Sequence, residues 1–470
     1  MKKQSLVLGL VLGGCLAAVA CSSSDDSASN SNGGSGGALG GSAGAGAHAG
    51  ASGGHAGGSG GTANGGSSEA GAEHGGSAGA SEAGAAGAPR VSEAGAGGEA
   101  GGGGFVFPPA LDPWTVLVPS APVAAPNHLL VAGTDFATST EIASVTLTPA
   151  AVGDSTTYAD GDALPVSSAG LGFVLEATND KVHLLDGGKV KTTFDVSDPG
   201  TDTAALADNK AYVPLYNKSL IAILDLAAGK VSRRVDLSQF DDPNDSDGSS
   251  DISAAAYDAN KHIAYFLLAR VDRNAIAADP DYHLPCSTTR GLIVGLDTTT
   301  DAIVDLNGAT DGKALPLTLV APTSLELNAA GTTLTLLATG CYDGATLKHQ
   351  GVEVITLMTG ASAIAYAPTS NDFLDTLIVT NGSNSLLHTF DDTFAGHWFK
   401  LNLATGVLGA ELSNVPDSVS YDGVDLLGVK ISGNVGKVVR YSIASETSTD
   451  VTATSWTGQY SMTSGTALVK

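Results

Sequence analysis

The stretch AYVPLYNKSLIAILDLAAGKV, residues 211–231, decides the fold class of this chain. Two apolar runs, 211–215 and 220–224, are separated by polar residues that include Asn217 and Lys218. Short apolar runs divided by a polar break are typical of two antiparallel strands joined by a turn. The second run ends at Asp225, and small residues with a glycine follow it, which predicts another turn. The segment therefore predicts a β-hairpin repeat.

Six further copies of this pattern lie along the chain. They end near Leu147, Asp186, Asp297, Leu357, Asn402 and Ile443. With the copy that ends at Asp225, most of the seven units are about 40 to 45 residues apart, which is the period of four-stranded propeller blades. No stretch shows a sustained helical period with caps, and this argues against helical solenoids. The sequence predicts an all-β chain with a single β-propeller of about seven four-stranded blades. The first and last units depart most from the pattern, so about six or eight blades are the alternatives.

Two segments resemble the repeats of a known group of propellers. They are IVTNGSNS, residues 378–385, and the stretch from Tyr212 to Val231, and both are similar to the YVTN repeats of YncE-like and surface-layer β-propellers. A longer stretch, from Val235 to Val294, resembles myxobacterial lipoproteins of the same group. The resemblance implies a WD40-like propeller fold and a location outside the cytoplasm. It implies no particular activity, because that group is mostly unassigned.

The first 20 residues have the pattern of a lipoprotein signal peptide. A positive start, MKK, precedes a short apolar core, and Cys21 follows a run of small residues. The pattern resembles a lipobox, in which the cysteine is freed by cleavage and diacylated, and the apolar core is too short to span a membrane. We expect a lipid anchor at Cys21, with Cys15 as the alternative. The protein is then extracytoplasmic and anchored to the bacterial cell envelope, at the outer membrane.

Residues 21–104 form a low-complexity tract of mainly Gly, Ala and Ser. The tract has no aromatic residue and few large aliphatic side chains, so no buried core can offset the entropy of ordering it. We expect a disordered tether that holds the folded domain on the order of 50 Å from its anchor. The propeller domain is then residues 105–470, and we expect it to be a monomer.

The charge balance excludes one class of partner. The chain has 22 Lys and Arg against 48 Asp and Glu, and its net charge of -26 repels phosphate backbones and anionic lipid headgroups. We therefore expect no nucleic acid partner. A protein or a glycan remains open as a partner.

The turn pattern separates the two faces of the predicted propeller. Tight turns at 258–261 and 298–301 belong to one face, which assigns the long insertions to the other. These insertions are 238–251, 274–289, 341–350 and 381–395.

Two cysteines, Cys286 and Cys341, then lie in equivalent loops of neighbouring blades. An even pair in an oxidising compartment predicts a disulfide. The alternative is a redox or metal-binding thiol pair, for which the chain offers no Cys-x-x-Cys motif.

The insertion face is also predicted to collect carboxylates. They are Asp241, Asp242, Asp245, Asp247, Asp251, Asp279, Asp281, Asp343, Asp391 and Asp392. The run DPNDSDG, residues 242–248, resembles a calcium loop, in which alternate side chains point inward and a glycine allows the sharp turn. It predicts calcium ligands at Asp242, Asn244, Asp245 and Asp247. A solvated acidic loop is the simpler interpretation, because Pro243 stands at the first ligand position and offers no side-chain oxygen.

Other chemistry has weaker support in the sequence. His283, His349 and His397 are predicted near the same face, where they would be candidates for a transition-metal site. Residues 105–470 contain no Gly-x-Ser-x-Gly elbow, no His-Glu-x-x-His pair, no phosphate loop and no dinucleotide fingerprint. A metal-assisted hydrolase of the propeller lactonase kind would need acidic and amide groups at the mouth of the axial channel. Residues of the required type are Asp236, Asp258, Arg270, Glu326 and Asn328.

These patterns predict a non-enzymatic, envelope-anchored scaffold that binds a protein, a glycan or a cation through the acidic loops of one face. The alternatives are the metal-assisted hydrolase and a purely structural envelope component. Carboxylates and amides that converge on the axis would favour the hydrolase, whereas a packed axis without them favours a scaffold or structural role.

Overall fold

The computed structural model describes residues 126–470 apart from short gaps. The gaps are 135–137, 162, 197–198, 200–201, 207–208, 217, 281–282, 288–289, 309–312, 371, 382, 392, 394, 417, 433–434, 452–455 and 458–461. The predicted signal peptide, the lipidation of Cys21, the tether and the start of the predicted domain lie outside the described residues, as do Asp281 and Asp392. Within the described part of the chain, no helix combines the length and the apolar character needed to cross a membrane.

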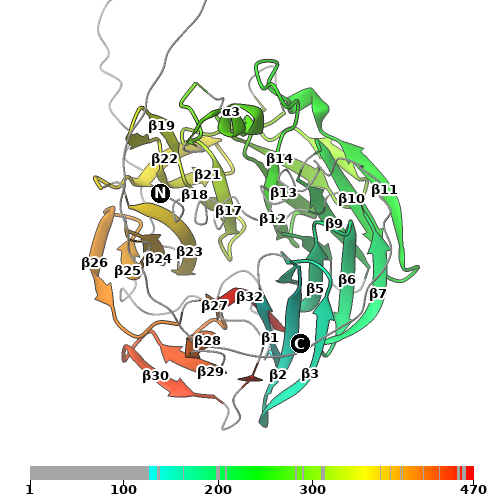
Figure 1. Ribbon diagram of the computed structural model, residues 1–470. Coiled ribbons are helices and arrows are strands. Elements are labelled where there is room, and N and C mark those ends of the chain that lie inside the picture. Colours follow the sequence, from blue (N-terminus) through cyan, green and yellow to red (C-terminus); the bar gives the residue numbers. More distant parts are fainter. Residues whose placement is uncertain are drawn as a thin grey trace, which may run out of the picture. The chain divides into compact units, whose positions relative to one another are not determined.

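Seven antiparallel sheets stand side by side in a ring, and each is a propeller blade with a path of four paired strands (Figure 1). We number the blades 1 to 7 along the chain and give their strands from the axis outward. The fold is an all-β propeller of seven four-stranded blades, as the repeat pattern predicts.

The first three blades are formed as follows. Blade 1 contains β32 (Met462–Val469), β1 (His128–Thr134), β2 (Thr140–Leu147) and β3 (Ala150–Tyr158). Blade 2 contains β4 (Leu164–Ser168), β5 (Leu171–Glu176), β6 (Lys181–Asp186) and β7 (Lys189–Asp195). Blade 3 contains β8 (Ala204–Leu206), β9 (Lys210–Leu215), β10 (Leu220–Asp225) and β11 (Lys230–Asp236).

The other four blades complete the ring. Blade 4 contains β12 (Ile252–Asp258), β13 (Ile263–Leu268), β14 (Leu292–Asp297) and β15 (Ala302–Val304), and β16 (Leu315–Pro316) also pairs with β14. Blade 5 contains β17 (Pro322–Leu327), β18 (Thr333–Ala338), β21 (Gly351–Thr356) and β22 (Ala361–Tyr366). Blade 6 contains β23 (Phe373–Asn381), β24 (Asn384–Phe390), β25 (Gly396–Asn402) and β26 (Val407–Leu412). Blade 7 contains β27 (Ser418–Tyr421), β28 (Leu426–Ser432), β29 (Val435–Ser442) and β30 (Thr447–Asp450), and β31 (Trp456–Thr457) also pairs with β29.

The predicted ends of the seven units coincide with one structural feature, the end of the third strand in each blade. Leu147, Asp186, Asp225, Asp297 and Asn402 are the last residues of β2, β6, β10, β14 and β25. In blades 5 and 7 the predicted end lies one residue beyond β21 and β29. One predicted insertion was wrong: 381–395 is not a single loop, because β23 ends at Asn381 and β24 occupies 384–390, which leaves a tight turn before β24 and a short loop after it.

Burial explains why the second and third strands are continuous apolar runs. Each blade packs between two neighbours, so both faces of these strands are covered, as in β10, where the four central residues are buried. The outermost strand of the same blade, β11, is mostly exposed and carries polar side chains, among them Arg233 and Arg234.

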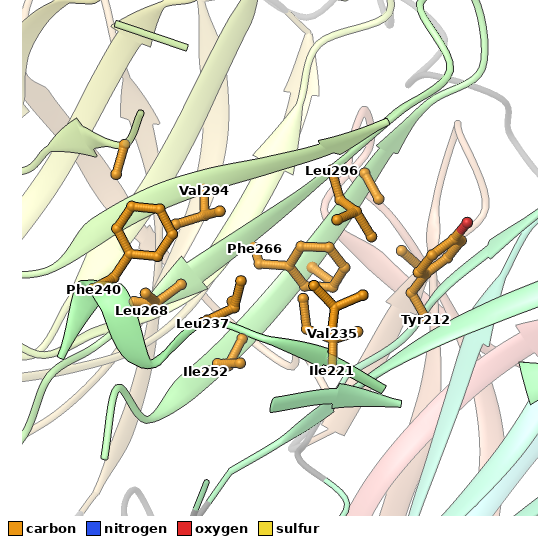
Figure 2. Close-up of a cluster of buried hydrophobic side chains, with 14 of the residues drawn as sticks. Tyr212, Ile221, Val235, Leu237, Phe240, Ile252, Phe266, Leu268, Val294 and Leu296 are labelled. Carbon is orange, nitrogen blue, oxygen red and sulfur yellow. The ribbon is translucent and has the colours of Figure 1, made fainter. Parts of the chain in front are cut away.

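The contact between blades 3 and 4 illustrates this packing (Figure 2). Tyr212, Ile221 and Val235 of blade 3 meet Phe266 and other apolar side chains of blade 4, and all of them are nearly free of solvent exposure. Each such side chain contributes roughly 1.5 to 3 kcal/mol when it leaves water. The Tyr212 hydroxyl also donates to Oδ1 of Asp301, at 2.7 Å.

The chain closes the ring with its last strand. The inner strand of blade 1 is β32, which pairs with β1 from the start of the described chain. Leu468 and Val469 of β32 pack with Leu129 and Leu130 of β1 in two buried clusters. This closure explains why the first unit of the sequence pattern departs from the others: its first strand lies at the other end of the sequence.

Candidate functional site

Three insertions form an ordered layer beside blades 4 and 5. The first contains the 3-10 helix η2 (Ser238–Phe240) and connects blades 3 and 4. The second contains α3 (Arg273–Ala278) and lies between β13 and β14, and the third is the hairpin of β19 (Cys341–Asp343) and β20 (Thr346–Lys348) between β18 and β21. We call these segments, 238–251, 269–290 and 339–350, the rim platform. All three are connections of the kind predicted for the insertion face.

The rim platform has a small core of its own. Buried apolar side chains from the second and third segments, and from the chain just before β17, form this cluster: Ala269, Val271, Ile276, Leu284, Val320, Ala321 and Cys341. Backbone bonds add to it, since the Tyr342 N–H donates to Leu284 O at 2.7 Å and the Cys286 N–H donates to Tyr342 O at 3.2 Å. The seven blades do not need this second core for their own packing, so it serves to fix the insertions.

Cys286 and Cys341 lie in this core at disulfide distance. Their sulfur atoms are 2.09 Å apart and their Cα atoms 4.9 Å apart, and 55 positions separate them in the sequence. The Cα separation is within the range of native bridges. A disulfide here would join the second and third segments of the rim platform.

The first and second segments meet through hydrogen bonds to carboxylates. Asp272 is the N-cap of α3, where its Oδ1 accepts from the Ala275 N–H at 2.9 Å and from the Ser246 hydroxyl at 2.8 Å. The Asp251 Oδ2 atom accepts from the Val271 N–H at 2.8 Å. The acidic loop is therefore folded against α3.

Three of the carboxylates converge. One oxygen atom from each of Asp245, Asp247 and Asp251 lies within 4.8 Å of the others. The Arg273 Nε atom is 3.1 Å from Asp247 Oδ2 and 3.2 Å from Asp251 Oδ1, and its guanidinium stands 5.6 Å from the ring centre of Tyr216. We call Asp245, Asp247, Asp251 and Arg273 the carboxylate group.

The predicted calcium ligands thus lie partly in this group and partly outside it. Asp245 and Asp247 belong to it, and Asp251 joins them although the loop pattern did not include it. Asp242 is not one of its carboxylates: its Oδ1 accepts from the backbone N–H of Asn244, at 2.9 Å, and from the side-chain amide of Asn244, at 3.2 Å. Sequence spacing could have pointed to Asp251, which stands in the ninth position of a loop that begins at Pro243.

Burial shapes the electrostatics of the carboxylate group. It raises the pKa of Asp251 well above its usual range, against the attraction of Arg273. Burial, together with the charges of Asp247 and Asp272, raises the pKa of Asp245 to about 6. Arg273 contacts Asp247 and Asp251, and the charge of Arg270 acts on Asp245, so three carboxylates face two guanidinium groups in a partly dry environment.

The three histidines do not meet. His283 stacks on Tyr342 with ring centres 3.8 Å apart, and His349 is exposed with a left-handed backbone (φ 55°). His397 lies on blade 6, where Nδ1 is 2.8 Å from Glu411 Oε1 and Nε2 is 3.3 Å from Asp391 Oδ2. In the described part of the chain, no group of three possible metal ligands contains a histidine.

Near the axis, the structure brings two carboxylates together. Glu326 lies on the inner strand β17 of blade 5, and Asp202 directly precedes the inner strand β8 of blade 3. Burial and the charge of Asp202 raise the pKa of Glu326 to about 7, and burial raises that of Asp202 to about 6. The charge of Asp202 thus acts on Glu326 although blade 4 stands between their own blades. The Asp202 Oδ2 atom also accepts from the Ala255 N–H of β12 at 2.8 Å.

The other residues considered for a hydrolase lie elsewhere. Asp258 and Asn328 stabilise the turns that follow β12 and β17, and Asp236 Oδ1 accepts from the Ser238 N–H, just after β11. Arg270 belongs to the rim platform, where its Nη1 atom donates to Arg290 O at 3.3 Å. Glu326 of this set interacts with Asp202, and the sequence pattern gave no sign of that partner.

Comparisons with known proteins address the fold. No protein-family model and no curated protein matches the chain. A Bacteroides uniformis protein provisionally described as a 6-phosphogluconolactonase is 12% identical, with a TM-score of 0.46, over 73% of this chain and 99% of that one. A periplasmic gluconolactonase of Pseudomonas aeruginosa is 12% identical with a TM-score of 0.44, over 72% and 98% of the two chains. Hydrazine synthase of Kuenenia stuttgartiensis is 12% identical with a TM-score of 0.42, over 59% and 76%. At these values the similarity concerns the fold alone, and propellers host unrelated functions.

Proposed function

We propose that this protein is a non-enzymatic scaffold, anchored to the bacterial cell envelope by a lipid at Cys21, that binds a protein or a glycan through the rim platform. One observation carries the proposal: two of the three insertions share a buried core outside the blades, and hydrogen bonds to Asp251 and Asp272 hold the first insertion against the second. Loops without a binding role need no such core, and ordering them costs conformational entropy. Binding residues are commonly placed on loops that a rigid scaffold positions.

The position of the converging carboxylates supports a scaffold over a hydrolase. In the described chain, the one group of three or more possible metal ligands lies in the rim platform. The axis holds the pair Asp202 and Glu326, which alone is too small a set for a catalytic divalent metal.

The test compares the rim platform with the opposite face. The purified protein is screened by calorimetry against isolated envelope proteins and surface polysaccharides. In the rim variant, Ala277→Arg and Asp343→Arg change two exposed positions. In the control, Val424→Arg changes a 61% exposed residue in the turn between β27 and β28. We expect the rim variant to lose the binding and the control to keep it. Binding that survives the rim variant and disappears in the control would contradict the proposal.

A metal-assisted hydrolase is the second candidate, and Glu326 is the observation that favours it. A carboxyl group with a pKa near 7 is suited to general acid and base chemistry at neutral pH. The test is turnover of a lactone panel with added divalent metals. Turnover that Glu326→Gln abolishes and Asp236→Asn leaves intact would favour the hydrolase. An absence of turnover with every metal would contradict the hydrolase and leave the scaffold as the proposed function.

A further inference from the structure

We infer that Asp245, Asp247 and Asp251 form a binding site for one calcium ion, which locks the first segment of the rim platform onto α3. The proposal goes beyond partner binding and does not depend on it, because an ion can be detected without any partner.

Each of the three carboxylates is held in place through one of its oxygen atoms. Asp245 Oδ1 accepts from the Asp247 N–H at 3.1 Å, and Asp247 Oδ1 accepts from the Ser249 N–H at 3.1 Å. Asp251 Oδ2 accepts from the Val271 N–H at 2.8 Å. The backbone thus fixes the orientation of the three side chains. It leaves the second oxygen of Asp245 for another contact, whereas the second oxygen of Asp251 faces Arg273 Nε at 3.2 Å.

These second oxygens are buried and accept no hydrogen bond. They are Oδ2 of Asp245 and Oδ1 of Asp251, and the Asp251 side chain has no solvent exposure at all. Leaving a buried acceptor unsatisfied costs about 1 to 3 kcal/mol, and more when the group is charged. Asp245 Oδ2 is therefore a costly acceptor in this position unless a cation reaches it, whereas Asp251 Oδ1 has the Arg273 guanidinium as a cationic partner.

Arg273 does not balance the group. Its guanidinium is in contact with Asp247 and Asp251, so its single positive charge is shared between two carboxylates. Two neighbouring charges act on Asp245 in opposite directions, since Asp272 adds a negative charge and Arg270 a positive one.

The spacing of the three residues fits calcium. If Pro243 is the first position of a calcium loop, Asp245, Asp247 and Asp251 stand at the third, fifth and ninth, which are ligand positions. Gly248 stands at the sixth, where such loops need a glycine, and its φ is 69°. The first and twelfth positions offer no carboxylate, so the affinity should be in the range of extracellular modules, about 0.1 to 1 mM.

The experiment uses the purified protein after treatment with a chelator and dialysis at fixed ionic strength. Calcium chloride is titrated by calorimetry, and thermal unfolding is recorded with and without about 10 mM calcium. We expect one ion per chain and a rise in melting temperature on the order of 1 to 3 °C, with a smaller effect from magnesium. Asp251→Asn and Asp245→Asn should both lose the binding heat and the shift.

Two variants serve as controls for this experiment. Asp279→Asn replaces a carboxylate of the rim platform that does not belong to the group, and it should bind as the parent protein does. Asp251 is buried, so if its variant does not fold, Asp245→Asn decides the outcome. Calcium binding that persists in Asp245→Asn, or no heat and no shift in the parent protein, would overturn the site.

Discussion

Burial and the charge of Asp202 both raise the pKa of Glu326. In the folded protein its carboxyl is near the axis, beside Asp202, and its pKa is about 7. In the unfolded chain the same group has its ordinary pKa of about 4.5. Between these two values the folded state binds more protons than the unfolded state, so the free energy of unfolding falls as the pH rises. The loss of stability that this group causes is absent below pH 4.5 and complete above pH 7.

The change Glu326→Gln removes this titration. We expect the parent protein to lose on the order of 2 kcal/mol of stability between pH 4.5 and pH 8, and the variant to lose clearly less. Urea unfolding midpoints at the two pH values measure the difference. The exposed Asp343, changed to Asn, serves as the control and should leave the parent's pH dependence as it is. Parallel curves for parent and Glu326→Gln would contradict the proposed ionisation.

Two glycines in the hairpin of the rim platform offer a matched pair. Both Gly340 and Gly344 have positive φ, 84° and 60°. A Cβ atom at Gly340 would lie 2.4 Å from the carbonyl oxygen of Lys348, whereas a Cβ at Gly344 would meet nothing within 4 Å. We expect Gly344→Ala to cost about 1 kcal/mol and Gly340→Ala about 1 to 3 kcal/mol more, as measured by chemical denaturation. Equal losses would mean that β20 moves freely away from Gly340.

At the scale of elements, the strands could be predicted because their signal is local. The apolar runs of 211–215 and 220–224 became β9 and β10, since covered strands need apolar side chains on both faces. The elements of the rim platform could not be predicted in this way. The short helix α3 and the hairpin of β19 and β20 carry too few residues for a periodic pattern, and contacts between distant segments hold them.

The same distinction explains the outcome for the site. Asp245 and Asp247 stand in one loop, so their spacing predicted that they would share a group. Asp251 joins them because the backbone of Val271, on another segment, binds its carboxylate. Asp202 and Glu326 come from blades that are not neighbours, and only the closed ring brings them together. Contacts of this kind depend on the whole fold and leave no mark in a short stretch of sequence.

The cysteine pair links two of these elements. If Cys286 and Cys341 are bridged, neither thiol should react with an alkylating agent until reductant is added, and intact mass measures this. In the chain-entropy account, closing a loop of 55 residues stabilises the fold by about 4 kcal/mol, so reduction should lower the melting temperature. The double variant Cys286→Ser and Cys341→Ser should melt near the reduced parent and no longer respond to reductant. Alkylation of both thiols in the untreated protein would contradict the bridge.

The whole molecule depends on the pairing of β32 with β1, because this pairing closes the ring. Without it, β1 becomes an open edge, and Leu129 and Leu130 lose the apolar side chains that cover them. A chain that ends at residue 461 lacks β32 and with it three buried side chains, those of Ala467, Leu468 and Val469.

We expect this shortened chain to lose on the order of 4 to 6 kcal/mol of stability, to unfold over a broader temperature range and to associate in solution through the open edge. Circular dichroism during heating and size-exclusion chromatography measure these effects. A chain that lacks only Lys470, an exposed residue, is the control and should match the parent. A synthetic peptide of residues 462–469 should partly restore the melting temperature, because the edge of β1 still offers its backbone groups. If the shortened chain melts with the parent's midpoint and remains monomeric, the other six blades hold the ring by themselves, and closure by β32 contributes nothing to its stability.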